Sequence, residues 1–435
     1  MKTLIYLFLM MFFLSLSFNA NAQRNILERA KNKLEEKLSE SKQKEKEEQE
    51  EQETEVEVIK QDVSDENASD KEISGTAEQP QTSEEQLKAW SNYNFVPGDK
   101  VIFEDDLLYE ENGEFPSKWD LMQGVAENAM IGNEKVIKFS FDEDIIFPLM
   151  KTEEDYLPDK FTIEFDAYFN REIDEDGDPE PWQTEYYVWL WNIKNFDGGY
   201  FARWAAGNRE DKDLQRISIE YNKVYMFDKY KSQIPVDPSE EKLSSKWRHV
   251  AIEFNIRSLK VYLDQHRLLN IPNIKCNPSA FFIGNVSDDM EWIPGAPDVL
   301  IKNIRIAEGG KTYYERFITD GKIVTTGIKF ASGKSDVKPE SMGVINKIVE
   351  LMNQHPEVNF SIDGHTDSDG DENINQTLSE KRAEAIKAEF VRLGISDNRL
   401  KTKGLGESNP VDENSTPEGK ANNRRVEFIK IDSVN

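Results

Sequence analysis

Residues 364–383 of the chain read GHTDSDGDENINQTLSEKRA, between a short apolar stretch at 358–363 and a longer helical pattern at 375–393. This order predicts a strand, a polar loop and a helix. Asp367 then lies in the loop, and Arg382 lies 15 residues further on, on the second turn of the helix. A carboxylate and a guanidinium held at a fixed separation are complementary to the zwitterionic end of an amino acid. The stretch therefore predicts a binding pocket in an α/β fold.

Two further motifs follow this loop. Residues 404–410 read GLGESNP, and residues 422–427 read NNRRVE. Together with the loop they match every fixed position in the pattern of the OmpA-like peptidoglycan-binding domain, which the last quarter of the chain resembles. The chain departs from the family where Phe330 is followed by Ala331, because many members have Asp there. Any contact made by that Asp is not carried over to this chain.

The resemblance implies that this domain binds the diaminopimelate of a peptidoglycan stem peptide. In the roles that it implies, Arg382 grips the carboxylate of the ligand, Asp367 takes the ammonium group, and Asn375 completes the pocket with the loop backbone. The predicted ligand-binding residues are Asp367, Arg382, Asn375, Thr366, Gly364, Leu378, Arg424 and Arg425.

These residues also have structural interpretations. Asp367 and Arg382 alternatively form an ordinary ion pair that orients the helix, and Asn375 also suits the N-cap position of that helix. Arg424 and Arg425 point to opposite faces if they lie on a strand. At least one of the two is then expected to pack or to remain a surface charge.

The same region alternates strands with helices. Buried positions of the second helix are expected at Leu378, Ala385, Ile386, Val391 and Leu393. Strands are predicted at 322–330, 358–363, 399–405 and 425–431, and helices at 339–353 and 375–393. This order predicts a compact α/β sandwich of the OmpA-like type at residues 320–435.

Residues 91–310 read as an all-β domain. Short alternating runs predict strands at 101–103, 135–141, 160–170, 186–193, 216–221, 223–227, 248–254, 258–263, 280–286 and 299–306. Short strands with no helical period between them predict an antiparallel sandwich or jelly roll. The hairpin at 246–264 resembles the hairpin of laminin-G and concanavalin-like sandwiches.

The first 90 residues read as targeting and linking sequence. Lys2, an apolar run at 4–18 and the A-x-A site at 20–22 predict a secretory signal peptide at 1–22. Residues 23–90 form an acidic low-complexity spacer, disordered or partly helical. No later stretch is long and apolar enough to span a bilayer. We therefore expect the mature chain to have no transmembrane segment and to be periplasmic, associated with the cell envelope or outer membrane.

Composition narrows the classes of partner. The formal net charge of -29 argues against DNA or RNA, since polyanions bind through clustered Lys and Arg. Cys276 is the single cysteine, which excludes an intrachain disulfide, and the four histidines show no metal-ligand spacing. No metal or other cofactor is expected.

The sandwich is expected to serve a structural purpose or to bind a glycan or an envelope protein. Tyr187, Trp189 and Trp191 share one face of a predicted strand, where they either stack on sugar rings or fill the core. An open aromatic face would favour a lectin-like carbohydrate binder.

An acidic stretch in the sandwich raises two further alternatives. Glu172 and Asp174 resemble the start of the E-I-D-x-x-E motif of laminarinase-type glycosidases, but Gly177 stands at the sixth position. Asp176 and Asp178 flank the same glycine, and with Asp174 they form either a calcium loop or an acidic turn. We expect a binding protein and not an enzyme, and the alternative is a wall-targeted glycan-processing enzyme.

Overall fold

The computed structural model describes residues 87–88, 90–139, 144–150, 155–169, 184–193, 214–226, 230–234, 246–285, 299–310 and 312–431. All of them lie in the second of two compact units, Pro80–Asn435. The predicted signal peptide, the spacer up to residue 86 and the acidic stretch from Glu172 to Asp178 lie outside the described residues. Along the described residues, no helix combines the length and the apolar character needed to cross a bilayer.

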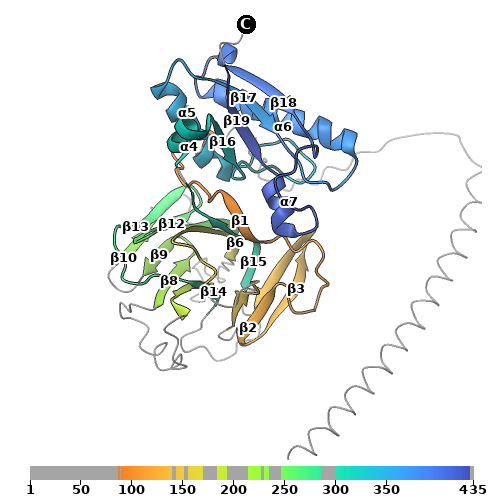
Figure 1. Cartoon of the computed structure of the whole chain (residues 1–435). Coiled ribbons are helices and arrows are strands. Elements are labelled where there is room, and N and C mark those ends of the chain that lie inside the picture. Colours follow the sequence, from red (N-terminus) through yellow and green to blue (C-terminus); the bar gives the residue numbers. More distant parts are fainter. Residues whose placement is uncertain are drawn as a thin grey trace, which may run out of the picture. The chain divides into compact units, whose positions relative to one another are not determined.

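The larger sheet of the sandwich has eight strands among the described residues, all paired antiparallel (Figure 1). Its order is β13 (His266–Ile271), β12 (Ser258–Leu263), β11 (Lys246–Asn255), β6 (Lys160–Phe169), β15 (Val299–Glu308), β4 (Glu134–Phe139) and β3 (Ala126–Ile131). Strand β1 (Lys100–Asp105) also pairs with β15.

The smaller sheet has seven strands among the described residues, and these too are antiparallel. Its order is β10 (Tyr230–Gln233), β9 (Lys223–Met226), β8 (Leu214–Glu220), β7 (Tyr186–Trp191), β14 (Ala280–Gly284), β5 (Ile145–Pro148) and β2 (Trp119–Gln123).

Side chains from both sheets fill one core. Ile163 and Phe165 of β6 pack in the same buried cluster as Val188 and Leu190 of β7. Alternate residues of a strand point to the same face, so Ile163 and Phe165, like Val188 and Leu190, face the space between the two sheets. The prediction of an antiparallel, β-rich middle domain is confirmed, while the jelly-roll and laminin-G resemblances remain predictions.

Five of the described strands, β2, β3, β5, β10 and β13, have no counterpart among the predicted strands. Each is only four to six residues long. Strand β10 has the sequence YKSQ and no buried residue, so no apolar alternation marks it. Such strands are held by pairing with their neighbours and leave little signal in the sequence.

The C-terminal domain contains a four-stranded sheet flanked by helices. The sheet order is β16 (Lys322–Thr325), β19 (Val426–Ile431), β17 (Asn359–Gly364) and β18 (Leu400–Gly404), with β17 and β18 parallel. The helices are α4 (Tyr313–Asp320), α5 (Met342–Gln354), α6 (Glu372–Arg392) and α7 (Pro417–Asn423), and short 3-10 turns lie at Pro339–Ser341 and Asp397–Arg399. Helix α4 is not predicted from the sequence, yet its Tyr313 and Phe317 belong to the core of this domain.

One predicted strand is too long. The prediction at 322–330 is wrong beyond Thr325, where β16 ends. Phe330 makes only an isolated bridge with Val337. The intervening chain instead turns toward the sandwich, where the backbone carbonyl of Thr326 accepts a hydrogen bond from Arg305 at 3.1 Å.

Helix α6 begins three residues before its predicted start. Asp371 is the N-cap, and its carboxylate accepts the backbone N–H groups of Asn373 and Ile374. Asn375 is therefore not the N-cap, and Arg382 lies on the third turn instead of the second. An ionised N-cap satisfies two of the four free N–H groups at a helix start, which explains the earlier beginning.

The buried face of α6 also differs from the predicted one. Its buried residues are Asn375, Ser379, Ala383, Ile386 and Phe390. Ile386 was expected there, whereas Val391 is 41% exposed, and Leu378, Ala385 and Leu393 are half-buried. Two of the buried residues, Asn375 and Ser379, are polar. A prediction that uses only the apolar residues of α6 therefore selects a different face of the helix.

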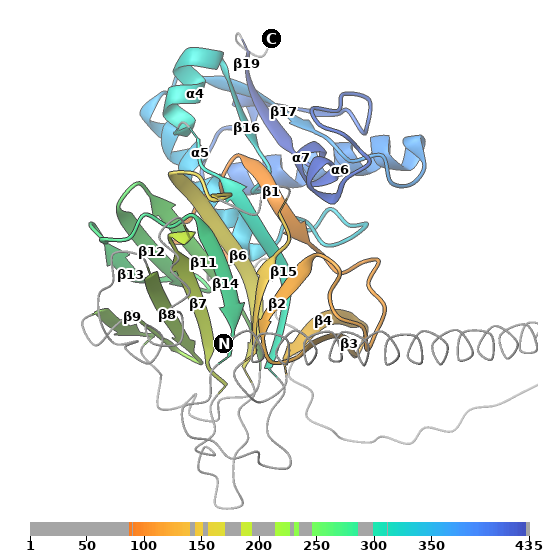
Figure 2. The same ribbon diagram turned by 60° about the horizontal axis from the view of Figure 1, so that its bottom comes forward.

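The outer face of the larger sheet packs against the C-terminal domain. Tyr262 of β12 lies in the same buried cluster as Phe95 and residues of α5, and the Phe95 and Tyr262 rings are 5.4 Å apart. Lys329 reaches Glu164 of β6 at 3.0 Å. Helix α7 lies beside β1 (Figures 1 and 2). The two domains of this unit are therefore joined by a packed interface, which the sequence does not predict.

Candidate functional site

The loop between β17 and α6 starts at a glycine that the packing requires. A Cβ at Gly364 would lie 2.5 Å from the backbone oxygen of Ser379 in α6. Only a residue without a side chain allows the end of β17 to lie this close to the helix. Gly364 therefore sets the spacing between the loop and α6.

Asn375 holds the loop from the first turn of α6. It is 5% exposed, and its Nδ2 donates to the Asp369 carbonyl at 3.0 Å and to the Asp367 carbonyl at 3.4 Å. The same nitrogen donates to Oε2 of Glu407 at 2.7 Å. A buried amide with several partners fixes the surrounding backbone, so Asn375 positions Asp367.

Asp367 pairs with Arg424, the residue that follows α7. Its Oδ2 accepts from Nη1 of Arg424 at 2.7 Å, and its Oδ1 accepts the N–H of Asp369 at 3.2 Å. Arg424 also pairs through Nη2 with Glu104 of the sandwich. Burial alone would lower the pKa of Arg424, but Glu104 and then Asp367 outweigh it and raise the pKa. Among the described residues, no ion pair joins Asp367 to Arg382, contrary to the simple helix-orienting alternative.

Arg382 has a different environment. Its Nε donates to the Lys334 carbonyl at 3.0 Å, and its guanidinium lies over the Phe330 ring at 4.9 Å. No carboxylate among the described residues forms an ion pair with it. Burial lowers its pKa, the charge of Asp367 opposes that shift, and the charge of Arg424 adds to it. A guanidinium nevertheless stays protonated at neutral pH, so Arg382 is a half-buried cation with unused donors.

The two arginines of the last motif precede β19, which begins at Val426, so the predicted strand alternation does not apply to them; their side chains nevertheless make different contacts. Arg425 is 4% exposed, and its Nη2 lies 2.7 Å from Oε1 of Glu427 and donates to the Asn409 carbonyl at 3.0 Å. Arg424 instead reaches the loop. Arg425 therefore holds β19 and the preceding loop together, while Arg424 bridges two domains.

Two buried polar side chains in the loop form no side-chain hydrogen bond with the described residues. Thr366 donates its backbone N–H to Gly406 at 2.9 Å, but its Oγ1 has no hydrogen-bond partner among the described residues. The two ring nitrogens of His365 likewise form no hydrogen bond with the described residues. Burial and the nearby Arg425 lower the pKa of His365 to about 4, so the ring is neutral at pH 7.

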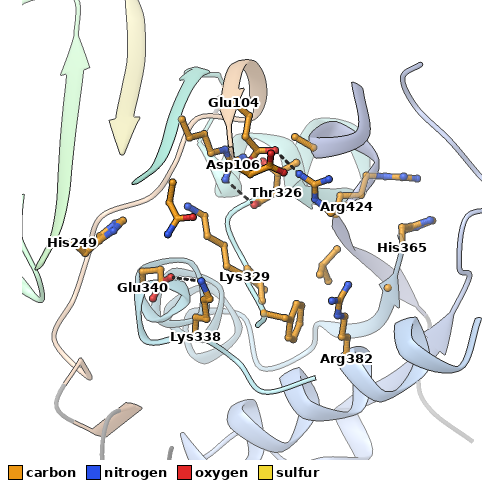
Figure 3. Close-up of a pocket in the computed structure, with 18 of the residues that line it drawn as sticks. Glu104, Asp106, His249, Thr326, Lys329, Lys338, Glu340, His365, Arg382 and Arg424 are labelled. Carbon is orange, nitrogen blue, oxygen red and sulfur yellow. Dashed lines mark hydrogen bonds and ion pairs between the residues drawn. The ribbon is translucent and has the colours of Figure 1, made fainter. Parts of the chain in front are cut away.

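A cavity of about 200 Å³ opens at these residues (Figure 3). Gly364, Arg382, Arg424 and Arg425 line it, as does His365. Arg382 points from α6 toward the side where Arg424 and Glu104 meet. Asp367, Thr366 and Asn375 are not among the residues that line this cavity; Asp367 contacts it through Arg424, Thr366 lies in the loop, and Asn375 lies on the first turn of α6.

Leu378 is the predicted site residue that lies apart from both this cavity and the loop. It lines a separate open depression of about 560 Å³ with Lys334, Asp336 and Lys381. The other predicted residues gather around the loop. The sandwich residues Glu104 and Asp106, which also line the cavity, were not predicted, because no motif connects them to the site residues of the C-terminal domain.

The aromatic stripe of the sandwich is closed in this structure. Tyr187, Trp189 and Trp191 are 3%, 1% and 2% exposed. They form a cluster with Leu214 and Phe282, apart from the core between the sheets. Side chains buried to this extent offer no ring face to a sugar.

Comparison with known proteins identifies the family of this region. Residues 329–424 match the model of the OmpA family. Outer membrane porin F of Pseudomonas fluorescens is 43% identical over 104 residues, which are 24% of this chain and 32% of the porin. The probable lipoprotein YiaD of Escherichia coli is 35% identical over 23% of this chain and 46% of its own length.

A third relative is named for its ligand. The peptidoglycan-binding protein ArfA of Mycobacterium bovis is 36% identical over 107 residues, which are 24% of this chain and 33% of that protein. This chain spans less than half the length of each of these three relatives. The matched segment covers β17, α6 and seven of the eight predicted site residues, all except Arg425, and the C-terminal part of the chain is an OmpA family domain.

Proposed function

We propose that the C-terminal domain anchors the protein non-covalently to peptidoglycan in the cell envelope. In this proposal the protein is exported to the periplasm and stays associated with the wall and the outer membrane. The names of relatives support it, since they include an outer membrane porin, a probable lipoprotein and a peptidoglycan-binding protein. The domain acts by binding and not by catalysis.

The unpaired guanidinium of Arg382 is the observation that carries this proposal. A half-buried cation without a carboxylate partner among the described residues gains most from an anionic ligand, because the ligand supplies a charge-assisted hydrogen bond. Arg382 therefore binds the carboxylate at the zwitterionic end of diaminopimelate. Its contacts with Lys334 and Phe330 keep the guanidinium in place before the ligand arrives.

Asp367 takes the ammonium group of the same end. One of its oxygens accepts only the N–H of Asp369 at 3.2 Å, which leaves room for a second donor. Arg424 holds the other oxygen at 2.7 Å and so fixes the direction of the carboxylate. Asn375 positions the loop, and Oγ1 of Thr366, which has no hydrogen-bond partner among the described residues, is available as a further acceptor.

The direct test uses two kinds of cell wall. The purified protein is mixed with sacculi whose stem peptides contain diaminopimelate and, in parallel, with sacculi whose stem peptides contain lysine. Lysine has the side-chain ammonium group but lacks the second carboxylate, so Arg382 has no partner there. We expect the protein to pellet with the diaminopimelate wall and to be released by free meso-diaminopimelate. Equal pelleting with both walls, or none with either, would contradict the proposal.

A further inference from the structure

The cavity beside Arg382 has one wall that does not belong to the C-terminal domain. Glu104 lies on β1 and Asp106 just after it, and both line the cavity (Figure 3). Phe103, next to Glu104 in β1, points into the core between the sheets, so the alternation of the strand directs Glu104 to the opposite face. The sandwich thereby presents carboxylates to a site built from residues of another domain.

These carboxylates leave one end of the cavity with an excess of negative charge. Arg424 pairs with Asp367 and with Glu104, and the charge of Asp106 also acts on it. Three carboxylates therefore share one guanidinium. Among the described residues, Asp106 has no ion-pair partner of its own; its Oδ1 accepts only the N–H of Leu108 at 3.3 Å.

On the C-terminal domain's side, Lys329, Lys338 and Arg382 also line the cavity, and the two lysines pair with Glu164 and Glu340. Arg382 has no carboxylate partner among the described residues, and Lys334 contributes only a backbone carbonyl. His365 also lines the cavity; it is 5% exposed, its ring nitrogens form no hydrogen bond with the described residues, and its Nε2 lies 3.7 Å from Oε1 of Glu427. The Glu104 and Asp106 carboxylates and the Arg382 guanidinium line one cavity, an arrangement that suits a ligand carrying an ammonium group and a carboxylate together.

We propose that the sandwich forms part of the ligand site and that Glu104 strengthens the hold on the ammonium group of the ligand. This proposal rests on the proposed function of the C-terminal domain. Glu104 acts in two ways. It adds a negative charge to the end that receives the cation, and it occupies one side of the Arg424 fork, so that Arg424 cannot neutralise Asp367 with both nitrogens.

The packed interface holds this wall in place. Asn422 of α7 bonds to the backbone of Val101 in β1, three residues before Glu104. Lys329 pairs with buried Glu164 on the sheet that β1 extends. The position of Glu104 relative to Arg424 is thus fixed by contacts on both sides of the cavity, which a flexibly tethered sandwich would not provide.

The test compares two probes with the full protein and its Glu104→Gln variant. meso-Diaminopimelate carries ammonium groups, whereas pimelate has the same two carboxylates and none. We expect Glu104→Gln to weaken binding of meso-diaminopimelate roughly fivefold, measured by NMR titration, because a nearby charge is removed from the cation side. Binding of pimelate should stay the same or tighten. Glu127→Gln, which removes an acid from β3 away from the cavity, is the matched control and should change neither.

Each other outcome has a definite meaning. If the unmodified protein binds neither sacculi nor meso-diaminopimelate, the proposed function fails. If it binds but Glu104→Gln binds meso-diaminopimelate equally or more tightly, the role of Glu104 is wrong. If binding of pimelate falls in parallel, Glu104 only supports the fold, which also overturns the inference. If Glu104→Gln does not fold, Asp106→Asn is used instead, because its amide oxygen can still accept the Leu108 N–H. This variant too should bind meso-diaminopimelate more weakly while binding pimelate equally or more tightly.

Discussion

The side chain of Asn422 pairs with both backbone groups of Val101, a residue 321 positions earlier in the chain. The N–H of Val101 donates to Oδ1 at 2.9 Å, and Nδ2 donates to the Val101 carbonyl at 3.2 Å. The amide thus acts as one more partner for the edge strand β1. This contact ties the sandwich to the helix that precedes Arg424.

The first prediction concerns that contact. Asn422→Ala leaves two buried backbone groups of Val101 without partners, so the free energy of unfolding should fall by about 1–3 kcal/mol. Urea denaturation of the purified protein measures it. Asn270→Ala, at an exposed position of β13, serves as the control and should be nearly neutral. Equal stability of the two variants would show that the contact contributes nothing.

The second prediction concerns the close approach of α5 to the chain that enters the sandwich. A Cβ at Gly343 would lie 1.7 Å from the Phe95 carbonyl oxygen. Gly343→Ala must therefore push the helix from this segment and should lower the thermal midpoint by several degrees, roughly the effect of 1–3 kcal/mol. Asn353→Ala near the exposed end of the same helix should leave the midpoint unchanged. An unchanged midpoint for Gly343→Ala would exclude this packing.

The third prediction separates positioning from direct binding. Asn375→Ala removes the donor to Asp369 and Glu407, so the loop should loosen and binding to peptidoglycan should weaken together with stability. A loss of about 1–3 kcal/mol in unfolding free energy is expected. Asn373→Ala, two residues earlier and exposed, is the control. Reduced binding without any loss of stability would instead assign Asn375 to the ligand directly.

The fourth prediction is a pH dependence at the interface between the domains. Burial alone would lower the pKa of His249, but its contacts with Asp166 and Glu164 outweigh burial and raise the pKa to about 10. The stabilisation from protonated His249 is then complete below its ordinary value of 6.5 and disappears as the pH rises through about 10. The carboxylates that face it are Asp166 at 2.9 Å and Glu164 at 3.6 Å, and Lys329 also contacts Glu164.

His249→Gln tests this dependence, because glutamine can donate a hydrogen bond but cannot titrate. The difference in unfolding free energy between the two proteins should be largest near pH 6. This difference in unfolding free energy should become smaller at higher pH, by at most about 1.4 kcal/mol for each pH unit. A difference that stays constant from pH 6 to pH 9 would mean that His249 is neutral in the folded protein.

The sequence predicts the local parts of the fold well. The alternation of apolar residues in β6 and the apolar periodicity of α5 arise from the side chains that face the cores, so both elements could be located within a few residues. The buried face of α6 could not be, because Asn375 and Ser379 are buried for their hydrogen bonds and not for apolar area. Short strands such as β10 depend on their neighbours and carry no period of their own.

The candidate site divides in the same way. The spacing of Asp367 and Arg382 is a property of one strand, loop and helix, so the sequence motif contains it. The pairing of Arg424 with Glu104 joins residues 320 positions apart and arises from the packing of two domains. Neither residue type nor spacing records such a contact. Only the folded chain shows that Arg424 serves Asp367 and leaves Arg382 without a carboxylate partner among the described residues.

Arg382 is proposed to bind the carboxylate of the ligand, and replacing this residue tests that contact directly. Arg382→Ala should lower co-sedimentation with diaminopimelate-containing sacculi at least roughly tenfold, since a charge-assisted hydrogen bond to the ligand is lost. Arg392→Ala, ten residues further along α6 and paired with Glu389, removes the same charge and should bind like the unmodified protein. Undiminished pelleting of a folded Arg382→Ala protein would contradict the account.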